Sequence, residues 1–505
     1  MKSKLALILG IVLFAGMPSA VAADNSLDWP PTFDGRTKLL GMSIQDDFGF
    51  GMVNRLSKSI IPGPQPFCTS LEDPACTSLS ANWWILRVLP PCIDTSENDD
   101  CVEGLEVTVN GETRKSVLVE RIKERTWVAD KTRGLPIAGS QGLWSDPFST
   151  DNSKLFYINV FGDLSAMNNG AGPFPLANFS ASITATSEAP SNSSVCIWRL
   201  DKRCGHRVAF GENQRLTLIL HLNPSLTGWL GGRLNSPSIS VSTLNSSVNR
   251  IMISGEPMNV NVVGATVPYE SAPADLISFM RKQNPGCPQD ECNIGTTSSG
   301  PHAFDLLENW KTFTKDTASR TIPYWSISRS PSSDAPNKCL SSGFVGLVTT
   351  NATAYQQSMP SLNGGELTYK VGGAHFMPDG VTLSSGTYNL LLRSDVARCV
   401  YGFSQAPIKA SVSVVSESDI QSVATETVME KDGWMYLAAN GFHFSQPSIK
   451  VKLSQEAPTP PLSGSAHASN QPSTPKISIT CQKGKVKKRV TGSAPTCPKG
   501  YKKVA

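Results

Sequence analysis

Short segments in which apolar and polar residues alternate run through most of the sequence, and this period of two constrains the fold more than any other feature. In residues 215–222 every second residue is leucine, and the residues between them include Arg215, Thr217 and His221. An extended chain with this pattern has one apolar and one polar side, as in a half-buried strand. The same reasoning predicts strands at 105–109, 154–161, 238–244, 258–263, 367–371, 408–415, 425–429, 434–437 and 448–453.

Composition agrees with a chain of many strands and turns. The 505 residues include 40 Gly and 36 Pro, and only 17% are charged, which excludes a coiled coil. Asp432 and Gly433 lie between two predicted strands and favour a tight hairpin, because both residue types tolerate a positive φ. Apolar residues at helical spacing occur in two central segments, 273–283 and 304–313. The sequence therefore predicts a mainly β protein with a few short helices.

Twelve cysteines lie in close couples along the chain. Zinc ligation would favour C-x-x-C pairs, which the sequence lacks, so an oxidised structural framework is the better interpretation. Spacing alone leaves the connectivity open. The neighbours suggest Cys68 with Cys76, Cys92 with Cys101, Cys196 with Cys204, Cys287 with Cys292, Cys481 with Cys497, and Cys339 with Cys399 as the remaining couple.

Residues 1–22 have the three regions of an export signal. Lys2 and Lys4 precede the apolar run 5–17, and a small-residue cleavage motif ends at Ala22. A retained anchor helix is the alternative, but this run is shorter than the roughly 20 residues needed to span a bilayer. We therefore expect a secreted protein, extracellular or associated with the cell surface, with no transmembrane segment in the mature chain.

The chain divides into five expected parts. Residues 23–267 and 268–454 are predicted to form two disulfide-pinned, β-sandwich-like domains, with the short helices in the second. Residues 455–475 contain five prolines among Ser, Ala, Thr and Gly, which predicts a semi-extended linker. Residues 1–22 are the signal, and residues 476–505 form a small basic module with two cysteines.

The basic tail is the most unusual segment. Residues 476–505 contain eight Lys, one Arg and no acidic residue. Because the whole chain carries +4, the signal +2 and the tail +9, residues 23–475 carry a net −7. This division favours contact between the tail and an anionic cell-wall polymer or surface, and a solvated basic terminus is the alternative. The residues expected to bind the polymer are Lys483, Lys485, Lys487, Lys488 and Arg489.

A metal site is the next candidate. Four carboxylates lie between two neighbouring cysteines, where oxygen ligands would suit calcium, although the spacing is not that of an EF-hand. A solvated acidic turn is the simpler interpretation. The candidate ligands are Asp94, Glu97, Asp99 and Asp100.

Catalytic motifs are absent from the sequence. It contains no Walker loop, G-x-S-x-G elbow or HExxH helix, so we assign no catalytic residue and expect no cofactor. His302, Asp305, His375 and Asp379 would suit a hydrolytic metal, but nothing in their spacing requires one. Exposed tryptophans would stack on sugar rings, but most of the ten are expected in the core.

Several segments resemble uncharacterised secreted proteins of aquatic actinobacteria. The segments are 100–105, 228–233, 395–407, 423–425, 433–434 and 440–452, and the ending 479–503 resembles a short C-terminal module found on otherwise different exported proteins of these bacteria. The resemblance implies export and surface association. It implies no activity and no catalytic residue.

Three functions remain open from the sequence. The first is a non-enzymatic protein of the cell envelope or extracellular space, with a displayed body and a tail held on an anionic envelope polymer. The second is a secreted carbohydrate-active or other hydrolytic enzyme that uses paired carboxylates. The third is a secreted nucleic-acid-binding protein whose tail contacts phosphates.

Overall fold

A computed structural model provides the three-dimensional structure of the chain. The predicted signal and nearly all of the predicted linker lie outside the residues that it describes. The described residues are 38–46, 53–58, 66–77, 82–122, 124–165, 172–190, 196–287, 292–296, 298–330, 339, 343–356, 360–363, 366–404, 408–415, 420–422, 425–444, 448–455, 477–483, 486–492 and 496–504.

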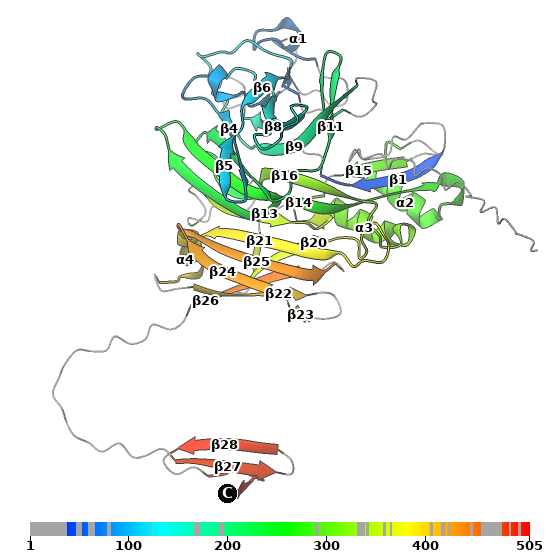
Figure 1. Cartoon of the computed structure of the whole chain (residues 1–505). Coiled ribbons are helices and arrows are strands. Elements are labelled where there is room, and N and C mark those ends of the chain that lie inside the picture. The colour runs from blue at the N-terminus through cyan, green and yellow to red at the C-terminus, as the bar shows by residue number, and fades with distance from the viewer. Residues whose placement is uncertain are drawn as a thin grey trace, which may run out of the picture. The chain divides into compact units, whose positions relative to one another are not determined.

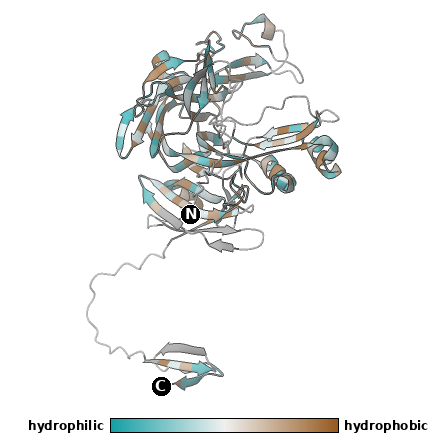
Figure 2. Cartoon of the chain, turned by 45° about the vertical axis from the view of Figure 1, so that its right-hand side comes forward, coloured by the Kyte–Doolittle hydropathy of each residue, from teal (hydrophilic) through white to brown (hydrophobic). Residues whose placement is uncertain are grey.

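The chain forms two compact units, which divide between Glu456 and Ala457. The first unit, called the body here, is mainly β, as the alternation predicts. Within it, hydrophobic and hydrophilic residues alternate along several strands (Figure 2). The second unit, the tail module, contains a three-stranded antiparallel sheet with β27 in the centre. Its strands are β27 (Ile477–Lys483), β28 (Val486–Gly492) and β29 (Lys502–Val504).

The described strands of the body form one 20-stranded sheet and a separate six-stranded sheet (Figure 1). Two parts of the larger sheet, called the first and the central sheet, are joined through β13 and β14, and the six-stranded sheet is called the third. The first sheet has the order β5-β4-β12-β14-β13 and is antiparallel throughout. Its strands are β4 (Cys101–Val109), β5 (Glu112–Lys115), β12 (Gln214–Leu222), β13 (Gly228–Thr243) and β14 (Asn249–Pro268).

The central sheet is the largest and incorporates the first half of β13. From β8 it continues through β9, β16, β13, β17, β21 and β25 to the edge strand β24. Its other strands are β2 (Arg55–Lys58), β3 (Trp83–Val88), β6 (Leu118–Arg121), β7 (Gly142–Ser145), β8 (Lys154–Leu164), β9 (Ser180–Pro190), β10 (Trp198–Leu200), β11 (Arg203–Arg207), β16 (Arg320–Ser330), β17 (Phe344–Thr350), β21 (Ser385–Arg393), β24 (Thr425–Lys431) and β25 (Trp434–His443).

The third sheet covers the far face of the central one. Its order is β18-β20-β26-β22-β23, with β19 paired to β20. Its strands are β18 (Ala354–Tyr355), β19 (Ser361–Asn363), β20 (Glu366–Gly372), β22 (Ile408–Val415), β23 (Ile420–Ser422) and β26 (Ser448–Gln455).

Two apolar cores hold the three sheets together. The core between the first and central sheets includes Leu218, Ile253 and Ile158. The core between the central and third sheets includes Leu390 and Val451. Because successive strand residues face opposite sides, β21 contributes Leu391 to the first core and its two neighbours to the second. The body therefore contains two β-sandwiches that share one sheet.

The long strands β13 and β14 link the two sandwiches. The first half of β13 pairs with β16 and β17 in the central sheet, and its second half pairs with β14 in the first sheet. Strand β14 then continues along β16 and ends beside β1 (Leu39–Ile44), which also pairs in parallel with β15 (Cys292–Thr296). Residues from both predicted domains thus share ladders, which periodicity within single strands does not reveal.

Helices cover a smaller third core. Trp310 and Met280 are completely buried there, with Leu40 of β1. The predicted central helices are confirmed as α2 (Ala274–Gln283) and α3 (Pro301–Thr314), while α1 (Pro74–Thr77) and α4 (Ser394–Tyr401) are short. Among the described residues no helix is long and apolar enough to cross a membrane.

All six cysteine couples are disulfides in the structure, with Cα–Cα separations between 5.0 and 6.1 Å. The predicted hairpin is also confirmed, because Asp432 and Gly433 both have a positive φ between β24 and β25.

Candidate functional site

The acidic turn considered as a calcium site makes contacts within the chain. Both oxygens of Asp94 accept hydrogen bonds from the guanidinium of Arg121, at 2.6 and 2.8 Å. Asp99 accepts from the Ser96 hydroxyl at 3.0 Å, while Glu97 is exposed. These contacts occupy carboxylate oxygens that a cation would need, so they favour the alternative of a structural turn.

The fourth carboxylate of this turn belongs to a buried pair. Asp100 accepts a 2.6 Å hydrogen bond from the backbone N–H of Asn223, and its Oδ2 lies 3.9 Å from the guanidinium of the completely buried Arg87. Burial raises the pKa of Asp100, and the cation of Arg87 opposes this effect. Asp100 therefore anchors the turn to the body.

Within the described part of the chain, one group of three potential metal ligands has its atoms within 4.8 Å of one another, namely Cys92, Cys101 and His221. The two cysteines are joined in a disulfide. Nε2 of His221 donates to the Glu103 carboxylate at 2.9 Å. The oxidised sulfurs do not supply the thiolates that metal binding requires.

The histidines and acids considered for a hydrolytic metal lie in separate structural contacts. Nδ1 of His302 is 3.0 Å from Oε1 of Gln283, and Nδ1 of His375 is 3.2 Å from a backbone carbonyl. Asp379 accepts hydrogen bonds from the backbone of its own turn, and Asp305 lies within α3. The described structure does not gather these four residues into one ligand group.

Tryptophans are mostly in the cores, as expected. Trp310, Trp325 and Trp434 are buried, whereas Trp84 on β3 is 44% exposed. The guanidinium of Arg55 lies 4.1 Å from the centre of the Trp84 ring. One face of this ring is thus covered by a cation of the same sheet.

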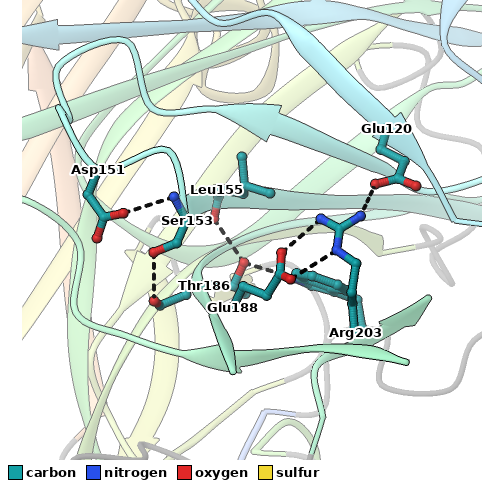
Figure 3. A network of polar contacts seen from close by, with 9 residues as sticks. Glu120, Asp151, Ser153, Leu155, Thr186, Glu188 and Arg203 are labelled. Atoms are coloured by element: carbon teal, nitrogen blue, oxygen red, sulfur yellow. Dashed lines mark hydrogen bonds and ion pairs between the residues drawn. The ribbon is translucent and has the colours of Figure 1, made fainter. Parts of the chain in front are cut away.

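A polar network links three strands of the central sheet (Figure 3). Arg203 on β11 donates to both oxygens of Glu188 on β9, at 3.0 and 2.8 Å, and to Glu120 on β6 at 2.6 Å. Hydrogen bonding from Arg203 lowers the pKa of Glu188. A general acid needs a carboxyl whose pKa is raised. The network therefore holds strands together and does not resemble a catalytic acid pair.

A cleft lies between the first sheet and the β21-β25-β24 part of the central sheet; we call it the inter-sheet cleft. Its volume is about 690 Å³. One group of lining residues comes from β12, β13 and β14, and the other from β21, β24 and β25. The lining residues are Arg215, Asn235, Ser236, Pro237, Ser238, Glu256, Thr387, Asn389, Leu391, Met429, Lys431, Tyr436, Leu437, Ala438 and Asn440.

Side-chain alternation explains why this cleft is polar. Along β21, the residues that face the third sheet stay apolar, as Leu390 does. On the opposite side of the strand, Leu391 belongs to the first core, and the next two residues on that side, Asn389 and Thr387, line the cleft. Strand β25 changes in the same direction, from Trp434 in the core to Asn440 in the cleft. The first core therefore ends where polar residues replace apolar ones on one face.

Arg215 is held at the other side of the cleft. Its Nε donates to the Ser254 hydroxyl at 2.9 Å, and one of its terminal nitrogens donates to the Ser236 carbonyl at 2.7 Å. Glu256 lies 3.9 Å away as a partial counter-charge. Burial raises the pKa of Tyr436, an effect strengthened by Asp432 and opposed by Arg215. Strands and hydrogen bonds thus set the position of the cation.

A smaller cleft of about 580 Å³ lies at the end of β8, β9 and β12. Phe156 and Phe210 stack on its apolar side, with ring centres 6.3 Å apart. On its polar side Gln214 donates to Asp146 at 3.0 Å. Asp146 also accepts from the backbone N–H of Phe148, so its carboxylate is engaged in holding the turn.

Sequence reasoning missed both clefts. For the inter-sheet cleft a signal was present, because Thr387 and Asn389 continue the period of Leu391 with polar side chains, as Asn440 does in β25. Which sheet would face these positions depends on pairings between distant segments, and a single strand does not contain that information.

Four of the five predicted polymer-binding residues lie on strands β27 and β28 of the tail module. Cys481 on the central strand β27 pairs with Lys488 of β28 and is joined to Cys497. Lys487 and Arg489 pair with Gln482 and Thr480 in the same ladder. In the tail module, the cations whose side chains are described and exposed are Lys483, Lys499, Lys502 and Lys503. Lys485 lies outside the described residues.

No protein-family model matches the chain, and no curated protein matches it.

Proposed function

We propose that this chain is an exported, non-enzymatic protein of the cell envelope or extracellular space, and that its tail module attaches it to an anionic polymer. One observation carries the proposal. The tail module is a compact unit of its own with a three-stranded sheet and an internal disulfide, and residues 476–505 carry nine cations and no acidic residue.

A folded cationic unit suits polymer attachment better than a loose charged end does. Pairing between β27 and β28 sets the spacing of Lys487, Lys488 and Arg489 along one strand, and the disulfide closes the module. A repeating anion attracts such an array at many points. Because residues 23–475 carry a net −7, the body repels the same polymer and leaves the tail module as the contact.

Six disulfides support the proposed export, because such bonds persist in oxidising compartments outside the cytosol. The resemblance to secreted actinobacterial proteins points the same way. The lining of the inter-sheet cleft gives less support to the hypothesis of a hydrolytic enzyme. The lining of the inter-sheet cleft includes one acidic side chain, that of Glu256, whereas glycoside hydrolysis uses a carboxyl pair.

The test is retention of the full-length protein on immobilised poly(glycerol phosphate), duplex DNA and a neutral glucan. We expect retention on poly(glycerol phosphate) that salt abolishes, since salt screens exposed charges within about 8 Å at physiological ionic strength. Replacing Lys483, Lys485, Lys487, Lys488 and Arg489 with Gln should remove it. A matched control replaces five exposed body lysines with Gln, at Lys115, Lys131, Lys154, Lys202 and Lys282.

The control variant should be retained to the same extent as the unmodified protein, because it loses the same number of charges but none from the tail. If the tail variant is retained to the same extent as the unmodified protein, the proposal is contradicted. Stronger retention on DNA than on poly(glycerol phosphate) would favour the nucleic-acid hypothesis instead.

A further inference from the structure

We propose that the inter-sheet cleft is a binding site for a neutral oligosaccharide. This site lies in the body and is independent of the tail module. The inference rests on the chemistry of the lining, its placement on paired strands, and its balance of charge.

Groups that both donate and accept hydrogen bonds dominate the polar lining. Asn389 and Asn440 carry amides, and Thr387, Ser236 and Ser238 carry hydroxyls. Amides and hydroxyls each have a donor and an acceptor. Within the body, the amide nitrogen of Asn389 already donates to Thr349 and Leu234, and the Ser238 hydroxyl accepts from Arg215, which leaves the amide oxygen and the hydroxyl proton for a ligand. Sugar hydroxyls have the same dual character, so a chain of hexopyranose units would satisfy such a lining more completely than a purely anionic or purely apolar ligand would.

An apolar strip crosses the floor of the cleft. Tyr436 on β25 pairs directly with Leu391 on β21 and with Met429 on β24. Met429 is 46% exposed, and Tyr436 is half-buried. An aromatic side chain combines a flat apolar face with a polar end. Sugar rings likewise carry C–H groups on their faces and hydroxyls at their edges, so a ring that lies on Tyr436 can keep its hydroxyls toward the neighbouring amides.

The polar groups are held before any ligand arrives. Nδ2 of Asn389 donates to the Thr349 hydroxyl at 3.1 Å and to the Leu234 carbonyl at 3.4 Å. Arg215 is held by Ser254 and Ser236. Side chains that are already positioned lose less conformational freedom on binding, and this favours affinity.

The cleft contains charges of both signs, so we expect its ligand to be neutral, unlike the polyanion proposed for the tail module. Arg215 and Lys431 are opposed by Glu256, so the lining lacks the uniform positive charge that a polyanion would select. The volume of about 690 Å³ lies within the range of about 300–1,000 Å³ that is typical of ligand pockets. A short segment of a neutral polysaccharide matches this combination of charge and size.

The test is calorimetric titration of the full-length protein with cellotetraose, chitotetraose, laminaritetraose and maltotetraose. We expect saturable binding of at least one of these sugars. Tyr436→Ala should weaken it about tenfold, since the apolar face is lost, whereas Tyr436→Phe should keep most of the affinity. Asn440→Ala should weaken binding by about threefold to tenfold.

Tyr269→Ala, which removes a half-buried tyrosine outside the cleft, is the matched control and should bind like the unmodified protein. The five-residue Gln variant of the tail should also bind the sugar normally, so failure of the tail proposal leaves this test intact. Thermal unfolding of each variant shows that it is folded. Absence of binding by all four sugars at millimolar concentration, or equal binding by folded Tyr436→Ala and Asn440→Ala proteins, would overturn the inference.

Discussion

Arg233 and Asp46 form a completely buried ion pair between positions 187 residues apart in the chain. The same guanidinium donates to the backbone carbonyls of Thr350 and Ala352, at 2.5 and 2.7 Å, and its carbon lies 4.4 Å from the centre of the Tyr355 ring. Burial lowers the pKa of Arg233, but the charge of Asp46 and the hydrogen bond to it, together with Tyr355 and Tyr324, raise the pKa overall. The pair therefore ties β13 and the end of β17 to the segment that follows β1.

Asp46→Ala should lower the free energy of unfolding by about 3–5 kcal/mol, because it leaves the charge of Arg233 buried without a counter-ion. Denaturant unfolding measures this loss. Glu188→Gln is the control, since Glu188 pairs with Arg203 in a partly exposed ion pair that contributes about 1 kcal/mol or less. If both variants lose the same free energy of unfolding, the buried Arg233 pair contributes no more to stability than the partly exposed one, which would contradict this prediction.

The raised pKa of Glu124 should make the stability of the protein depend on pH. Burial raises the pKa of Glu124 from 4.5 to about 6, partly offset by a hydrogen bond from Gln141 and the charge of Arg125. The folded state therefore holds this proton more tightly than the unfolded state does. Its stabilising effect is complete below about pH 4.5 and is lost as the pH rises through 6.

Glu124→Gln should remove this loss. Between pH 4 and pH 8, the free energy of unfolding of the variant should therefore improve relative to the unmodified protein, by about 1–2 kcal/mol. Denaturant unfolding of both proteins at the two pH values measures the difference. A difference between the proteins that does not change with pH would contradict the raised pKa.

Strands were the part of the fold that the sequence predicted well. Residues 215–222 alternate so regularly that β12 follows from them directly, and Asp432 and Gly433 mark the hairpin between β24 and β25. The course of β14 could not be predicted in this way. Its 20 residues have different neighbours along their length, and each change of partner depends on segments far away in the chain.

The candidate site shows the same limit. The sequence alone shows that Lys487, Lys488 and Arg489 belong to a strongly cationic segment, because charge density does not depend on tertiary structure. The inter-sheet cleft could not, since Arg215 and Tyr436 are brought to it by different sheets. Periodicity shows that a residue lies on one side of a strand, but not what faces that side.

The disulfides should contribute unequally to stability. Cys339 and Cys399 close a loop of 60 residues, whereas Cys287 and Cys292 close one of 5. In the chain-entropy account a longer loop restricts the unfolded chain more. Replacing both cysteines with Ser should therefore cost about 4 kcal/mol at the first bond and about 2 kcal/mol at the second, as measured by denaturant unfolding. A larger loss at the shorter loop would contradict this ranking.

Sedimentation of the protein with isolated cell envelopes tests the proposed attachment most directly. The comparison is between the full-length protein and a form that lacks residues 476–505, each at low and at high salt. We predict that the full-length protein sediments with envelopes at low salt and is released at high salt, because exposed charge pairs are screened. The shortened form should stay in solution at both salt concentrations while its body remains folded. If it sediments as well as the full-length protein does, the tail module is not the attachment site.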